Sequence, residues 1–147
     1  LLKGWRTPHF GSFENRKNLR LIHSLCSRFD YRFSSSSSGL NGFIRGPISV
    51  SSQIREFSVT GHGTAGFGVL DSWSFQKVSG EEIVIDVPRF YEAYKNMEEN
   101  YRGIHSVINL YFDPRHIKNV PEFWEMMKFI VESRECISFV DLNRLLK

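Results

Sequence analysis

An abrupt change in composition near residue 60 is the feature that most constrains this chain. Residues 1–60 contain nine Lys/Arg, three Asp/Glu and twelve Ser. Residues 61–147 contain ten Lys/Arg, thirteen Asp/Glu and six Ser. The net charges are therefore +6 and −3, which argues against a uniformly basic nucleic-acid-binding fold. If the first segment is not structural, about 90 residues remain to form a core, and such a core is small on surface-to-volume grounds.

The first segment has the composition of an organellar transit peptide. It is rich in Arg and Ser and poor in acidic residues, and the serine run 34–38 has no apolar side chains with which to order itself. Arg55, Phe57 and Ser58 resemble a mitochondrial processing site, which predicts cleavage between Phe57 and Ser58. We therefore expect residues 1–57 to be a disordered mitochondrial transit peptide. A plastid destination and a basic tail that binds RNA or protein are the alternatives.

A short amphipathic helix is expected over residues 19–29 of this segment. Leu21, Leu25 and Phe29 are spaced to share one face, and Arg20 and Arg28 frame that face. A cationic amphipathic helix suits an anionic membrane surface or the groove of an import receptor.

The last sixty residues have the apolar periodicity of helices. We expect helices over 88–102, 103–112, 120–134 and from 139 onward, with Asp113-Pro114 ending the second. Residues 58–87 then form a linker or extended arm, in which the β-prone run 82–87 has no obvious partner strand. The chain starts without methionine and stops inside an amphipathic pattern, so we interpret it as a fragment of a longer protein.

Catalytic and metal-binding patterns are not recognisable. Cys26 and Cys136 lie far apart, and the five histidines are scattered without a carboxylate or thiol pattern that joins them. We therefore expect no enzyme activity, no metal and no cofactor. No apolar run approaches the roughly 20 residues that a membrane span requires, so stable membrane insertion is not expected.

Apolar residues recur at an interval of 35 positions near the C-terminus. The matched pairs are Ile104 and Phe139, Val107 and Leu142, Leu110 and Leu145, and Tyr111 and Leu146. A period of this length in paired helices predicts a solenoid, in which each helical hairpin buries its apolar face against the next.

This segment resembles the pentatricopeptide repeat proteins of plant organelles. Residues 104–138 would be one 35-residue repeat and residues 139–147 the start of the next. The apolar pairs 110–111 and 145–146, and the Phe-Trp-Glu-Met-Met-Lys run at 123–128, carry the resemblance. It implies an all-α fold, in which helical hairpins over 88–147 begin an alpha-solenoid that follows the disordered transit peptide and the linker.

The resemblance also implies a function. Such proteins bind single-stranded RNA with one base per repeat, read by two or three side chains. Asn143 would be the fifth residue of the second repeat and Ser138 the last residue of the first, which makes them the expected RNA-binding residues. The implied function is organellar RNA binding in mitochondrial RNA processing or expression. The alternative is a helical structural or assembly subunit of a mitochondrial complex, whose partners are other mitochondrial proteins rather than RNA.

Overall fold

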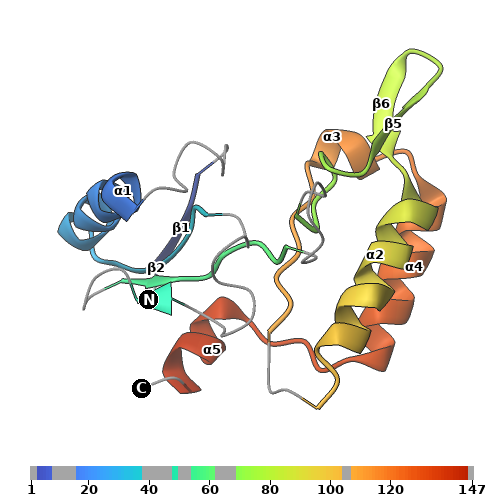
Figure 1. The fold of residues 1–147 in the computed structure, drawn as a ribbon. Coiled ribbons are helices and arrows are strands. Elements are labelled where there is room, and N and C mark those ends of the chain that lie inside the picture. Colours follow the sequence, from blue (N-terminus) through green and yellow to red (C-terminus); the bar gives the residue numbers. More distant parts are fainter. Residues whose placement is uncertain are drawn as a thin grey trace. The chain divides into compact units, whose positions relative to one another are not determined.

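The computed structural model describes residues 3–7, 16–37, 48–49, 54–61, 69–103 and 107–145. The chain divides into two compact units. Unit 1 comprises residues 1–60 and 137–147, and unit 2 comprises residues 61–136. Each unit is described by itself below (Figure 1).

Unit 1 is built around a four-stranded sheet. Its elements are β1 (Lys3–Arg6), α1 (Arg16–Arg28), β2 (Tyr31–Ser35), β3 (Ile48–Ser49), β4 (Arg55–Glu56) and α5 (Phe139–Leu145). The strand order is β1-β2-β4-β3, in which β1, β2 and β4 are parallel and β3 is antiparallel to β4. The first three elements thus form a βαβ unit, because α1 carries the chain from β1 to its parallel neighbour β2.

The helices α1 and α5 pack on this sheet. The ring centroid of Phe139, in α5, lies 5.8 Å from that of Phe33 in β2 and 5.1 Å from that of Phe57, which follows β4. Glu56, which precedes Phe57, instead contacts His23 of α1. Since neighbouring residues of a strand point to opposite faces, α1 and α5 cover opposite faces of the sheet.

The amphipathic helix predicted over 19–29 is confirmed as α1, and it buries Leu19, His23 and Cys26. The expectation that the serine run 34–38 is unordered is wrong for its first four members. Ser34 and Ser35 belong to β2, and residues 34–37 are all buried. The Glu56 carboxylate accepts the N–H groups of Ser36 and Ser37, and the Ser35 hydroxyl accepts a hydrogen bond from Arg6; composition alone reveals neither partner.

The strands of unit 2, β5 (Gln76–Ser79) and β6 (Glu82–Ile85), form a β-hairpin. The partner strand that the run 82–87 seemed to lack is thus β5. Ser79 pairs with Glu82, so Gly80 and Glu81 form a two-residue turn. Gly80 has a φ of 62° and Glu81 has no positive φ, which is the pattern of a type II′ turn and favours glycine at the first central position.

Three helices complete unit 2, namely α2 (Val87–Asn100), α3 (Pro114–Ile117) and α4 (Pro121–Ser133). A proline lies in the first turn of each, where its missing N–H costs nothing. Four aromatic rings join the hairpin to the helices, with successive centroid distances of 5.5, 5.2 and 4.7 Å along Phe75, Phe90, Phe112 and Phe123. The predicted helices over 88–102 and 120–134 are confirmed as α2 and α4.

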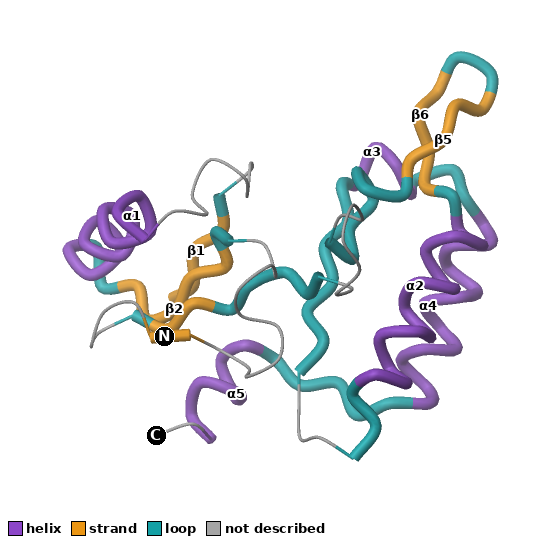
Figure 2. Tube along the Cα trace, viewed as in Figure 1, coloured by secondary structure: helices purple, strands orange, loops and turns teal. Residues whose placement is uncertain are grey.

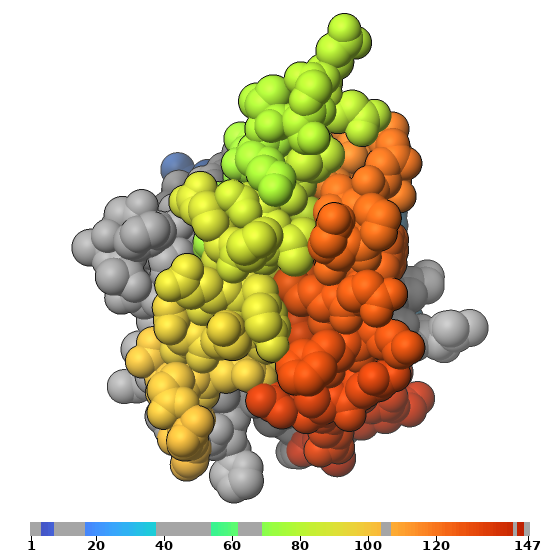
Figure 3. Space-filling model, turned by 90° about the vertical axis from the view of Figure 1, so that its right-hand side faces the viewer, coloured from blue at the N-terminus to red at the C-terminus, as the bar shows by residue number. Residues whose placement is uncertain are grey.

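The all-α solenoid prediction is wrong, because the chain has a mixed α/β fold with two sheets. Its helical pair also has the wrong polarity for a hairpin. Tyr91 contacts Phe129 through their rings, and further along both helices Glu98 pairs with Arg134, which follows α4. The second contact lies C-terminal to the first on both chain segments, so α2 and α4 run side by side in the same direction (Figures 2 and 3). A solenoid hairpin needs antiparallel helices.

The helix expected over 103–112 is also absent from its described part. Residues 107–112 have no helical structure, and Tyr111 pairs with Asp71 in a parallel bridge. Residues 104–106 lie outside the described part of the chain. Asp113 and Pro114 begin a helix rather than end one, because the Asp113 carboxylate accepts a hydrogen bond from the N–H of Arg115 and thereby caps α3. None of the helices in the described segments is long and apolar enough to cross a membrane.

Candidate functional site

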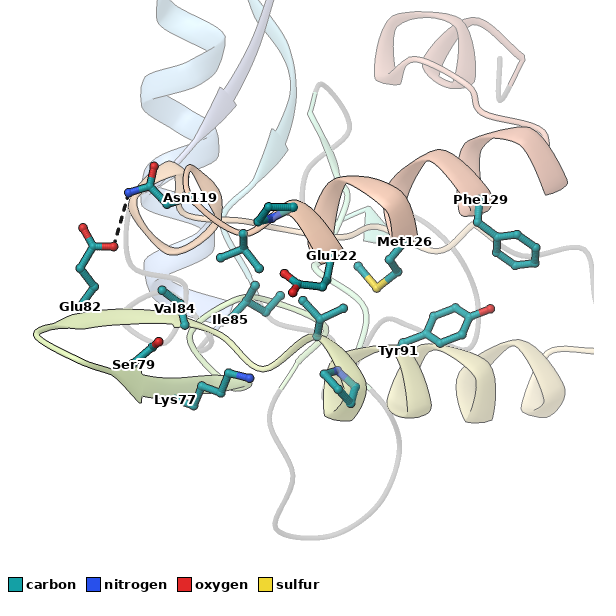
Figure 4. A pocket seen from close by; sticks show the side chains of 14 residues that line it. Lys77, Ser79, Glu82, Val84, Ile85, Tyr91, Asn119, Glu122, Met126 and Phe129 are labelled. Carbon is teal, nitrogen blue, oxygen red and sulfur yellow. Dashed lines mark hydrogen bonds between the residues drawn. The ribbon is translucent and has the colours of Figure 1, made fainter.

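A groove of about 640 Å³ opens in unit 2 beside the β5–β6 hairpin. Val84, Ile85 and Met126 form part of its apolar lining, and Tyr91 and Phe129 line it further along α2 and α4 (Figure 4). Lys77, Ser79, Glu82, Asn119 and Glu122 supply its polar groups. A concave, mostly apolar site with a few polar groups at its edge is the usual form of a binding site.

Local structure explains how the groove is held open. Lys77 and Val84 are paired across the hairpin, so their side chains emerge on the same face, toward the groove. The chain then turns directly into α2, whose N-cap Asp86 accepts a hydrogen bond from the N–H of Arg89. Because β6 and α2 are joined without a loop, the hairpin and the first turn of the helix form one continuous wall.

The polar end of the groove is pinned by contacts to the segment after α3. Glu82 accepts a hydrogen bond from Asn119 at 3.4 Å and lies 3.6 Å from the ammonium group of Lys118. These groups are exposed, so each contact adds little to stability, but together they connect the hairpin to the opposite wall.

The groove has an acidic setting. Unit 2 contains eight Lys/Arg and twelve Asp/Glu, a net charge of −4, whereas unit 1 has a net charge of +7. Glu122 extends from the first turn of α4 toward the groove, and no ion pair to a described residue is recorded for it. The division of charge is thus sharper between the two folded units than between the two halves of the sequence, and it places the groove on the acidic side.

A second polar cluster, in unit 1, is completely buried. His23 and Glu56 have no exposed side-chain surface, and the His23 Nε2 atom lies 2.9 Å from Glu56 Oε2. Glu56 Oε1 accepts hydrogen bonds from the N–H groups of Ser36 and Ser37, at 2.6 and 2.9 Å, and from the Ser37 hydroxyl at 2.9 Å. Four donors therefore surround one carboxylate.

These donors determine the charge state of the cluster. Burial opposes ionisation of Glu56, but the hydrogen bonds from His23, Ser36 and Ser37 outweigh it and lower the pKa of the carboxyl. His23 Nδ1 is buried and has no hydrogen-bond partner among the described residues. Since the ionised Glu56 carboxylate can only accept, His23 Nε2 is the donor of the hydrogen bond between them. Burial, together with the Glu56 charge, raises the pKa of the nearby Cys26 thiol.

Ser72 and His116 form another cluster that the sequence did not reveal. The Ser72 hydroxyl oxygen accepts a hydrogen bond from the N–H of Asp113 at 2.8 Å, which leaves its hydrogen free to bond His116 Nδ1 at 3.2 Å. Burial raises the pKa of the neighbouring Asp71, whose carboxylate accepts the N–H of Ser74 at 2.7 Å. These residues have the types of a hydrolytic triad, but Ser72 is fully buried and anchors the start of α3, which is a structural role.

The structure places the predicted cleavage site in the core of unit 1. Phe57 is buried and donates its N–H to the carbonyl of Ser34, and Ser58 is partly buried with its hydroxyl 2.6 Å from that of Ser37. Proteolysis between Phe57 and Ser58 therefore requires this segment to leave the sheet.

The two predicted RNA-binding residues both lie in or beside α5. Ser138 caps this helix, because its hydroxyl accepts the N–H of Asp141 at 3.1 Å and lies 2.6 Å from the Asp141 carboxylate. Asn143 is in α5, and its side chain is outside the described part of the structure. Neither residue lines the groove, and α5 packs on a sheet rather than on a helical repeat.

Metal ligands do not gather in the described segments, where no group of three His, Cys, Asp or Glu side chains could hold an ion. Both cysteines are free, with Cys26 buried and Cys136 exposed. In comparisons with known proteins, no family model, no curated protein and no solved structure matches the chain. The comparisons therefore give no support to the resemblance to pentatricopeptide repeat proteins.

Proposed function

We propose that this chain is a binding protein that assembles with other proteins, and that the unit 2 groove is its binding site. The occupant is a cationic amphipathic segment of a partner protein. Its apolar side chains contact Val84, Met126 and Phe129, and its Lys or Arg side chains approach Glu122. The single observation that carries this proposal is an apolar groove of about 640 Å³ inside a unit of net charge −4.

The exposed aromatic ring of Phe129 supports a polypeptide occupant. This side chain is 57% exposed although it lines the groove, and its ring lies nearly perpendicular to that of the half-buried Tyr91, at 6.3 Å between centroids. Partly exposed aromatic residues beside an apolar depression are typical anchors of protein interfaces. Acidic charge around the depression selects against phosphate backbones and for cationic partners.

Location in the mitochondrion is part of the proposal. The Arg-rich, Ser-rich composition of residues 1–57 supports it, as does the amphipathic pattern of α1.

The test is a binding titration of the full chain with a fluorescein-labelled peptide of alternating Leu and Lys pairs, followed by fluorescence anisotropy. Phe129→Ala is expected to weaken binding by at least about tenfold, because an aromatic side chain that becomes buried on binding contributes roughly 1.5–3 kcal/mol. Val131→Ala is the matched control, since Val131 is 52% exposed on the same helix and does not line the groove. Glu122→Gln is expected to weaken binding and flatten its salt dependence, whereas Glu125→Gln on the same helix is not.

Two results would overturn the proposal. One is equal binding by the Phe129→Ala and Val131→Ala variants, which would place the peptide elsewhere. The other is preferential binding of a single-stranded oligouridine, which would favour the RNA-binding function implied by the sequence resemblance. Circular dichroism spectra of each variant confirm that the fold is retained.

A further inference from the structure

The outward side of α1 carries an apolar stripe that the fold of unit 1 leaves exposed. Leu21 and Leu25 of α1 and Phe29, which directly follows the helix, recur every four residues, and their exposed fractions are 60%, 41% and 66%. A different side of α1 faces the core, because Leu19 and Cys26 are buried against the sheet. The three exposed apolar side chains are therefore not needed for packing within unit 1.

A row of cations runs beside this stripe. At 100° per residue, Lys17 and Arg28 flank Leu21 on the side away from the buried face, and Arg20 lies further round the same flank. All three cations are exposed, and α1 contains no acidic residue. None of these cations forms an ion pair with a described residue, whereas the exposed Arg32 is paired with Asp30 at 2.6 Å. Their charge is thus available to an external anion.

We propose that this stripe docks unit 1 on the surface of an anionic lipid bilayer, an activity separate from the unit 2 groove. Leu21, Leu25 and Phe29 would enter the boundary between headgroups and acyl chains, while Lys17 and Arg28 would pair with lipid phosphates. A helix with one apolar stripe and one cationic flank lies in the plane of such a surface, and its affinity depends on both terms.

Geometry favours a lipid surface over the other anionic or apolar partners. A receptor groove that encloses a helix needs access to much of its circumference, but the side of α1 with Leu19, His23 and Cys26 is already buried in unit 1. A planar surface needs only the outward strip. Nucleic acid would match the net charge of +7 but would leave the apolar row in water.

The test is co-flotation of the full chain with vesicles of phosphatidylcholine alone or mixed equally with phosphatidylserine. Binding is expected only to the anionic vesicles and should decline as salt is added. The paired substitution Leu21→Ser and Leu25→Ser should lower the bound fraction about tenfold, because it removes apolar area from the interface. Leu145→Ser is the matched control, since Leu145 is 75% exposed in the same unit but belongs to α5.

Charge is tested separately with Lys17→Gln and Arg28→Gln against the control Arg144→Gln, an exposed residue that is paired with Asp141. The first two should reduce vesicle binding and the third should not. The proposal is overturned if neutral vesicles bind equally well, or if the substituted chain with Ser at positions 21 and 25 binds like its control. It is also overturned if only the charge substitutions reduce vesicle binding, the apolar substitutions leave it unchanged, and a single-stranded oligonucleotide displaces the vesicles.

Discussion

Removing the buried carboxylate of Glu56 should selectively destabilise unit 1. In a Glu56→Ala variant, the donors on His23, Ser36 and Ser37 lose their common acceptor in a region with no exposed side-chain surface. Deleting one partner of a buried polar pair typically costs about 3–5 kcal/mol, because the groups left behind stay buried without partners. A loss of this size is a large fraction of the 5–15 kcal/mol by which domains are usually stable.

Amide hydrogen exchange followed by mass spectrometry measures this loss locally. Exchange of a peptide that spans β2 (Tyr31–Ser35) should accelerate by about two to three orders of magnitude, at 1.4 kcal/mol per tenfold change. A peptide from α4 reports on unit 2 and should exchange at its original rate. The matched control is Asp30→Asn, which removes an exposed ion pair with Arg32 and should change exchange by less than about fivefold. Asparagine also tolerates the positive φ of 60° at this position.

The same carboxylate predicts a dependence on pH. The pKa of Glu56 is lower in the folded chain than its ordinary value of 4.5, so the ionised form stabilises the fold above pH 4.5 and this contribution is lost as the pH falls through the folded pKa. Glu56→Gln keeps the shape but cannot ionise. The stability difference between the two proteins, from urea unfolding, should therefore be constant at neutral pH and shrink below about pH 4.5.

Unchanged β2 exchange in Glu56→Ala would refute the role given to this cluster. A stability difference between wild type and Glu56→Gln that does not vary between neutral and acid pH would show that the carboxylate is not held ionised by its donors.

Three further predictions concern packing and capping. Phe90→Ala should cost unit 2 about 3–5 kcal/mol, measured as faster exchange in α2, because Phe90 is fully buried among aromatic rings. Gly4→Ala should destabilise unit 1 by about 1–3 kcal/mol in urea unfolding, since an added Cβ would lie 1.9 Å from Cε2 of the Phe33 ring, which is held by its neighbours. Ser138→Ala should cost α5 about 1 kcal/mol by loss of its cap, seen as faster exchange of that helix. A loss of RNA binding without this change would contradict the capping role.

Helix positions were readable from the sequence because their signals are local. The apolar stripe and the early proline of residues 88–102 predicted α2 to within two residues at either end, and the same reasoning located α4. The segment 103–112 failed because its apolar residues suit a helix and a buried extended chain equally well. Asp113-Pro114 was read as a helix end, although Asp followed by Pro is also the pattern of an N-cap and first turn.

The groove and the buried carboxylate could not be predicted, since each depends on contacts between distant residues. Nothing near Glu56 in the sequence indicates that Ser37, Ser36 and His23 will converge on it from 19, 20 and 33 positions away. The groove likewise requires that β6 pair with β5 and that α2 and α4 run in the same direction. Both are tertiary choices that a 35-residue apolar period does not specify.

The sequence by itself determined the charge division, the amphipathic character of α1 and the places where four helices form, namely α1, α2, α4 and α5, because composition and periodicity act over neighbouring residues. Tertiary structure alone decided that a serine-rich run becomes a buried strand, that residues 139–145 pack on a sheet instead of beginning a second repeat, and that an acidic unit is hollowed beside its hairpin. These outcomes depend on which distant groups satisfy buried hydrogen bonds and fill apolar space, and local patterns do not encode the partner.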